Sequence, residues 1–82
     1  MQRDAHAYLA DIVESCNAID SAIAGMELDD YLESRLVRSS VEREFTIIGE
    51  AVLALSRKAP EVFAAVTGSR RIIDFRNRLT HE

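Results

Sequence analysis

The last seven residues of the chain, RNRLTHE, bring three polar side chains of complementary chemistry close together in sequence: Arg76, Asn77 and His81. Histidine titrates near neutral pH and can move protons. Arginine can neutralise the negative charge that builds up on a phosphate during attack, and asparagine can orient either neighbour. The set fits cleavage of RNA without a metal, in which a ribose 2′-hydroxyl attacks the adjacent phosphate.

The spacing of these residues favours a site shared by two copies of the chain. On a straight helix, Asn77 and His81 lie on one face, whereas Arg76 points about 140° away from His81. A second copy of the helix across a two-fold axis would bring both sets around one groove, so we expect a composite site in a homodimer. Further cations of the same segment are expected to bind the RNA backbone: Arg70, Arg71 and Arg78.

No metal or other cofactor is expected from the sequence. His6 lies far from His81 along the chain, and no carboxylate and histidine stand at ligand spacing. We interpret His6 as an exposed helix residue. Taken alone, Arg76 and His81 also fit a solvated helix end whose cations interact favourably with the helix dipole.

Length and composition predict one helical domain, residues 1–82. A chain of 82 residues buries only about 60% of its unfolded surface, so a lone monomer would be marginally stable. Hydrophobic residues make up 48% and Trp is absent, which suits an aliphatic core between packed helices. Cys16 is the single cysteine and is expected to be buried. Neither a leader nor a membrane-spanning run is present, so a cytoplasmic location is expected.

The charge is unevenly distributed along the chain. The net charge of −4 argues against simple nucleic-acid binding, but residues 1–34 carry −7 and residues 35–82 carry +3. Nine of the ten cations are arginine, which binds phosphate as a planar fork. Pairing of these arginines with acids on neighbouring turns is the plainer interpretation.

Hydrophobic periodicity predicts three main helices and one or two short ones. The first spans residues 4–24, with Asp4 as its cap and Gly25 as its stop. Residues 27–38 form a short helix, and residues 60–66 start at Pro60. The last main helix spans residues 70–82 and is expected to bury Ile72, Phe75 and Leu79. Two sets of side chains are expected to face inward: Leu9, Ile12, Val13, Cys16, Ile19, Ile23 and Met26 in the first helix, and Leu28, Tyr31, Leu32 and Leu36 in the second.

The second main helix, residues 40–58, is expected to be central or to meet a partner chain. Ser39 and Glu42 match a capping box at its start. Val41, Phe45, Ile48, Val52 and Leu55 form one apolar row, and Ile47, Ala51 and Ala54 form a second. Glycine inside a helix costs about 1 kcal/mol relative to alanine, which close approach of another helix backbone would explain. We therefore predict a dimer interface made by Phe45, Ile48, Gly49 and Val52.

Three stretches in the same order resemble the HepT-like branch of the HEPN superfamily. The ending IIDFRNRLTHE resembles the branch motif R-N-x-L-x-H, with Arg76, Asn77 and His81 at the matching positions. The stretch YLADI at residues 8–12 is similar to YLEDI of that branch, and IIGEA at residues 47–51 matches a mid-chain landmark. Together these stretches extend over nearly the whole chain, from residue 8 to residue 82.

The resemblance implies an all-α, homodimeric ribonuclease toxin of a type VII toxin–antitoxin pair. Arg76 and His81 would be catalytic, with Asn77 as their polar companion. The partner would be a minimal nucleotidyltransferase, an MntA-like antitoxin, that adds AMP to a tyrosine two residues after the histidine. The sequence stops at Glu82, where that tyrosine would come next, so we expect the domain to be incomplete at its C-terminus.

Two other classes of function stay open on the sequence alone. One is a non-catalytic HEPN-like binding module that dimerises and pairs with a nucleotidyltransferase. The other is a plain helical dimerisation protein. Arg76, Asn77 and His81 together favour the ribonuclease.

Overall fold

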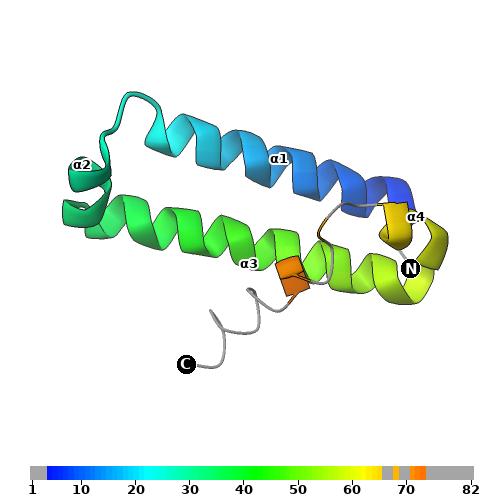
Figure 1. The fold of residues 1–82 in the computed structure, drawn as a ribbon. Helices are drawn as coiled ribbons and strands as arrows, with labels where there is room; N and C mark the ends of the chain where they lie inside the picture. The colour runs from blue at the N-terminus through cyan, green and yellow to red at the C-terminus, as the bar shows by residue number, and fades with distance from the viewer. Residues whose placement is uncertain (1–3, 66–67, 69–70, 74–82) are drawn as a thin grey trace.

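The protein is built on a pair of long antiparallel helices (Figure 1). A computed structural model describes residues 4–65, 68 and 71–73. The long helices are α1 (Ala5–Ile23) and α3 (Arg35–Lys58), and the short helices α2 (Leu28–Glu33) and α4 (Pro60–Ala65) lie at opposite ends of the pair. The described residues contain no strand, so the predicted all-α antiparallel bundle is confirmed.

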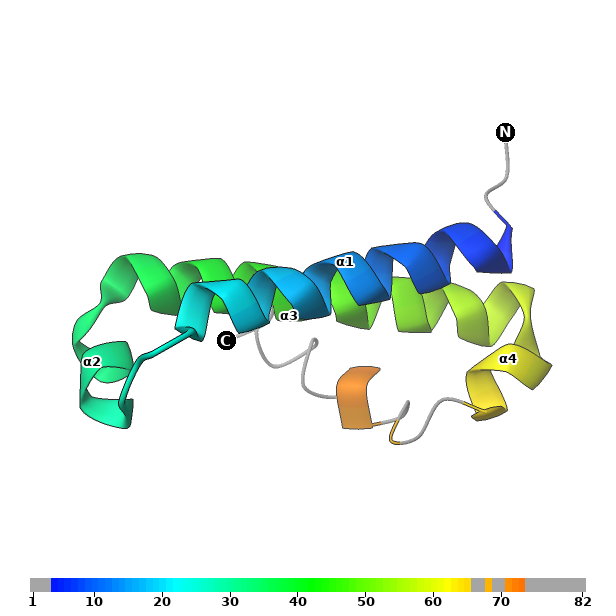
Figure 2. The ribbon, with the colours of Figure 1, turned by 90° about the horizontal axis from the view of Figure 1, so that it is seen from above.

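Helix α2, helix α4 and a further helical turn at residues 71–73 lie on the same side of the α1–α3 pair (Figure 2). The predicted helix over 70–82 lies outside the described residues apart from that turn. Within the described part of the chain, no helix is long and apolar enough to cross a membrane.

Helix α1 is one residue shorter at each end than the predicted helix over 4–24, and both the predicted cap, Asp4, and the predicted stop, Gly25, flank it. The Asp4 Oδ1 accepts a hydrogen bond from the backbone N–H of Ala7 at 3.0 Å, which satisfies one of the free amides of the first turn. Gly25 follows the helix with φ of 75°, a conformation that glycine adopts without steric cost. The chain can therefore reverse direction and enter α2.

The inward face of α1 differs from the predicted stripe. Ser15 and Ile19 are buried, with Ile12 partly buried beside them, whereas Val13 is 59% exposed and Cys16 is exposed. The predicted burial of Cys16 is therefore wrong. The apolar face of α1 is wider than the surface that α3 can cover. Helix α3 covers the side of α1 that includes Ser15 and leaves the side with Val13 and Cys16 exposed.

The boundary between α2 and α3 also differs from the prediction. Helix α3 starts at Arg35, because the Ser34 hydroxyl oxygen accepts a hydrogen bond from the Val37 N–H at 3.2 Å and caps it. Ser39, the predicted cap, lies inside the helix. Tyr31 packs against the core as predicted. The predicted inward placement of three leucines is wrong, because all are exposed: Leu28, Leu32 and Leu36.

Helix α3 is the central element, as its two apolar rows predicted. It contacts α1, α2 and α4. In the first predicted row, Phe45 is partly buried and the other four side chains are buried: Val41, Ile48, Val52 and Leu55. Leu55 and Val52 have no exposed surface. Most of the apolar burial therefore lies along one helix.

Candidate functional site

Five of the six residues predicted to act on RNA lie outside the described residues: Arg70, Arg76, Asn77, Arg78 and His81. Arg71 is described, and its side chain is exposed. The structure thus describes the three residues that lead into the motif, and the roles of the motif residues stay predictions.

The segment leading into the motif is attached to the core mainly by Ile73, the residue after the predicted Ile72. Ile73 is 5% exposed and packs in one cluster with Ile19 of α1 and with α3, while Ile72 packs against the edge of the cluster. The Ile72 N–H donates to the Gly68 carbonyl oxygen at 3.0 Å, which forms the helical turn. Arg71 and Ile73 are about 160° apart on such a turn. Burial of Ile73 therefore leaves Arg71 facing away from the core.

A polar groove lies between α1 and α3. It consists of two adjoining pockets of about 170 and 330 Å³ that share Asp11 and Ile47. The remaining charged side chains along it are Glu14, Arg43, Glu44 and Glu50. Acidic groups thus outnumber the one base. Because carboxylates repel phosphate, this groove is unsuited to the RNA backbone.

The charges divide between the helical body and the segment that follows it. Residues 4–65 hold twelve acidic and five basic residues, a net charge of −7. Residues 66–82 hold four arginines and two acidic residues, a net charge of +2. Any phosphate-binding function is therefore best supplied by the segment that contains the motif.

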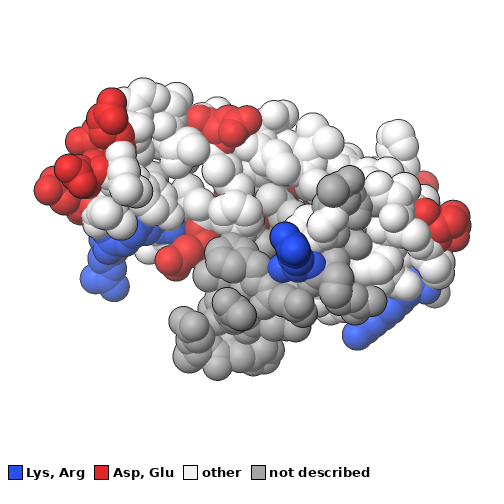
Figure 3. Space-filling view, in the orientation of Figure 1, with Lys and Arg blue, Asp and Glu red and all other residues white. Residues whose placement is uncertain are grey.

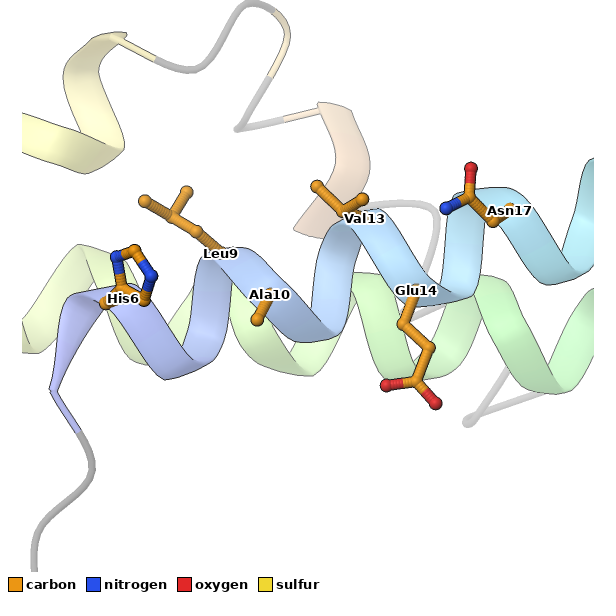
Figure 4. Close-up of a pocket in the computed structure, with 6 residues that line it drawn as sticks. All are labelled: His6, Leu9, Ala10, Val13, Glu14 and Asn17. Atoms are coloured by element: carbon orange, nitrogen blue, oxygen red, sulfur yellow. The ribbon is translucent and has the colours of Figure 1, made fainter.

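A hollow on α1 is lined by His6, Leu9, Ala10, Val13, Glu14 and Asn17 (Figure 4). At 1.5 Å rise per residue, His6 and Asn17 are about 16 Å apart along the helix axis, and His6 and Glu14 about 12 Å. These polar groups cannot meet at one reacting atom. In addition, no group of three or more metal-ligating side chains gathers in the described ranges.

The residues predicted for the dimer interface are mostly used within one chain. Ile48 and Val52 are 5% and 0% exposed and belong to the same cluster as Ile73, and Gly49 is buried. Phe45 is partly buried and packs against this cluster. The apolar row of α3 is thus explained by the core of a single chain. Dimerisation and the residues of its interface stay predictions.

One contact that the sequence did not predict joins the start of α1 to the end of α3. The Lys58 Nζ lies 5.9 Å from the centroid of the Tyr8 ring, within the range of a cation–π interaction. The two residues are far apart in sequence, and although Tyr8 begins the YLADI stretch, nothing in that stretch points to Lys58. Only the antiparallel pairing of the helices, once known, would have placed them together.

Comparison with known proteins gives a family. The sequence profile of the family described as Ribonuclease HepT-like matches residues 12–82. MJ1380 of Methanocaldococcus jannaschii, provisionally named an RNase, is 30% identical over 81 residues, which are 99% of this chain and 73% of that protein. MJ1216 of the same organism, similarly named, is 26% identical over 81 residues, 99% of this chain and 66% of that protein. No solved structure gives a significant match.

Proposed function

Because the chain belongs to the HepT-like ribonuclease family, we propose that it is a metal-independent endoribonuclease that acts through Arg76, Asn77 and His81. The observation that carries the proposal is the presence of all three residues, at the spacing of the motif, inside the matched residues 12–82. The α1–α3 groove is acidic and unsuited to phosphate, and the polar groups of the α1 hollow lie too far apart along the helix to act on one atom.

In the proposed reaction, the ribose 2′-oxygen attacks the neighbouring phosphorus and the bond from phosphorus to the 5′-oxygen breaks. His81 accepts the proton of the 2′-hydroxyl or supplies one to the leaving 5′-oxygen. Arg76 stabilises the additional negative charge on the phosphorane oxygens, and Asn77 orients the histidine or the phosphate. The products are a 2′,3′-cyclic phosphate and a 5′-hydroxyl.

Two features of the described residues support this proposal. Ile73 attaches the segment to the core three residues before Arg76, and a catalytic side chain is effective only when a fixed scaffold positions it. The net charge of −7 on residues 4–65 would also repel RNA from the helical body. The substrate is thereby directed to the arginines that follow.

The cellular role that we propose is that of a toxin in a type VII toxin–antitoxin pair. Its partner would be a minimal nucleotidyltransferase that silences it by adenylylation, and its active form would be a homodimer. Support comes from the family resemblance of the three sequence stretches.

The test is cleavage of a fluorescent single-stranded RNA in the presence of EDTA. We expect cleavage to persist, with His81→Ala and Arg76→Ala each losing about 10²–10⁴-fold in rate. The matched controls are His6→Ala and Arg57→Ala, whose side chains are exposed in the helical body. Loss of cleavage on chelation, or equal losses for His6→Ala and His81→Ala, would refute the proposal. Retained binding to a nucleotidyltransferase without cleavage would favour the non-catalytic binding module.

A further inference from the structure

One buried polar side chain lines the groove between α1 and α3 without a hydrogen-bond partner. Ser15 is 3% exposed and lines the larger of the two pockets, which holds about 330 Å³. Among the described residues, no hydrogen bond involves its hydroxyl. Burying a hydroxyl without a hydrogen bond costs free energy, and such a group commonly marks the place of a bound water, ion or ligand. Ser15 therefore points to a binding site in this groove.

Carboxylates surround Ser15 from both walls of the groove. On α1, Asp11 and Ser15 are four residues apart and lie on one face, which Glu14 borders. On α3, Glu44 and Glu50 are about 9 Å apart along the helix axis, at 1.5 Å per residue. The negative charge of the groove is thus spread along its length and comes from both helices.

This spread of charge decides which kind of cation fits. No group of three or more metal-ligating side chains gathers in the described ranges, so the groove does not suit a compact metal ion. Its form is elongated, because the two pockets adjoin through Asp11 and Ile47. Ile47 also supplies an apolar surface between the charged groups. A fitting ligand carries several positive charges along an apolar chain.

Basic side chains lie toward both ends of the groove. Arg43 lines the larger pocket together with Glu44. Tyr8 lines the smaller pocket, and the Lys58 Nζ lies 5.9 Å from the centroid of its ring. Arg43 and Lys58 are about 22 Å apart along the axis of α3. Because like charges repel, these two bases limit how far a cationic ligand can extend.

We propose that the groove between α1 and α3 binds a linear aliphatic polyamine of the size of spermidine. Its ammonium groups donate hydrogen bonds to the Ser15 Oγ and to the carboxylates of Glu14 and Glu44. Its methylene groups lie against Ile47. Hydrogen bonds between charged groups are about twice as strong as those between neutral groups, so the carboxylates supply most of the affinity and Ser15 fixes the position.

The inference does not depend on the proposed ribonuclease activity. The charges that make the groove unsuited to the RNA backbone are the charges that attract a polycation. Polyamine binding is therefore measured without RNA and without any assay of cleavage.

Binding is measured by isothermal titration calorimetry with spermidine at low ionic strength. Glu14→Gln and Glu44→Gln should each weaken binding about fivefold. The matched controls are Asp29→Asn and Glu33→Gln, whose exposed carboxylates belong to the acidic α2 end of the molecule (Figure 3), and both should bind as the parent does. Circular dichroism checks that each variant is folded. No binding by the parent, or equal weakening by all four variants, would overturn the proposal.

Two other cations separate a fitted polyamine from other ligands. Hexaamminecobalt(III) has the same charge as spermidine at neutral pH but no chain, and it should bind about fivefold more weakly. Equal affinity would show attraction to charge alone and would overturn the proposal. Nα-acetyl-lysine amide carries the single ammonium group of a lysine side chain. If it binds as tightly as spermidine, the groove receives a lysine of a partner protein and the polyamine proposal fails.

Two further substitutions should act in opposite directions on binding. Ser15→Ala removes the hydroxyl that lacks a partner, so spermidine affinity should fall about threefold while the thermal midpoint stays equal or rises. A lower midpoint would mean that the hydroxyl is bonded within the fold, and it would overturn the reasoning. Arg43→Gln removes a repelling charge and should tighten binding about twofold. Weaker binding by Arg43→Gln would place the ligand outside the groove and overturn the proposal.

Discussion

Replacement of Ile73 by alanine tests whether the segment leading into the motif is part of the core. The side chain is 5% exposed and packs with Ile19, Val41, Ile48 and Val52. Buried isoleucine to alanine costs about 2–5 kcal/mol, from lost transfer free energy and from the cavity left behind. At about 0.05–0.15 kcal/mol per residue, the whole chain has roughly 4–12 kcal/mol of stability. The substitution should therefore remove a large fraction of the free energy of unfolding.

The assay is urea unfolding followed by circular dichroism at 222 nm. With a urea m-value of about 1.5 kcal/mol/M, a loss of about 2–5 kcal/mol lowers the midpoint by roughly 1.3–3.3 M. Ile73→Val should lower it less, since that change costs about 0.5–1.5 kcal/mol. The matched control is Arg71→Ala on the same helical turn, which is exposed and should stay within about 0.5 kcal/mol of the parent.

A midpoint change for Ile73→Ala no larger than that of Arg71→Ala would refute the reasoning. It would mean that the turn at residues 71–73 does not share the cooperative core of α1 and α3. If the reasoning holds, Ile73→Ala should also slow RNA cleavage under conditions where the protein remains folded. Displacing the motif by about an ångström is enough to impair catalysis.

Three further predictions follow from the caps, the turn and the tyrosines. Ser34→Ala should lower the free energy of unfolding in urea by about 1 kcal/mol, because it removes the cap of α3. Ser39→Ala should lower it by less than about 0.5 kcal/mol, and a larger loss for Ser39→Ala than for Ser34→Ala would place the start of α3 at Ser39, as the sequence predicted. Gly25→Ala should destabilise by about 1–2 kcal/mol through the positive φ alone, since an added Cβ meets no atom within 4 Å, and an unchanged thermal midpoint would contradict this. The 82-residue chain should gain no AMP from a nucleotidyltransferase and ATP, because Tyr8 is half-buried near Lys58 and Tyr31 packs against the core; a mass increase of one AMP on either tyrosine would contradict it.

The long helices could be predicted because several independent signals agreed in each. In α1, Asp4 and Gly25 mark the ends of a continuous helical period. In α3, the row from Val41 to Leu55 has one strongly apolar face, and the structure buries that face. Where composition, period and caps coincide, the local sequence is sufficient.

The errors arose where two candidate faces or caps were nearly equivalent. Helix α1 is apolar on both sides of Ile12, so the sequence could not say that α3 would cover Ser15 and leave Cys16 exposed. Ser34 and Ser39 both precede helical residues, and the earlier serine became the cap. Leu28 and Tyr31 differ in direction by about 60° on a helix, and only packing against the core decided which turned inward.

The motif itself was recognisable from residue types and spacing, but the acidic groove of the helical body was not. The α1–α3 groove draws its acidic residues from distant parts of the chain, so no local pattern announces it. The exposure of Leu28, Leu32 and Leu36 could not be predicted, because a four-residue step is equally typical of a buried helix face.

The position of Ile73 has a consequence for the order of events during synthesis. The ribosome adds about 5–20 residues per second, and the partners of Ile73 are all synthesised before it: Ile19, Val41, Ile48 and Val52. These side chains therefore emerge from the ribosome before Ile73 can pack against them. The segment that we assign to RNA cleavage thus comes shortly after Ile73, the last residue of the core among the described residues. A nascent chain would gain its stable fold and its proposed activity almost together. A deletion that removes residues 71–82 would abolish the stable fold and the proposed activity together, whereas substitution of Arg76 or His81 would remove the activity alone.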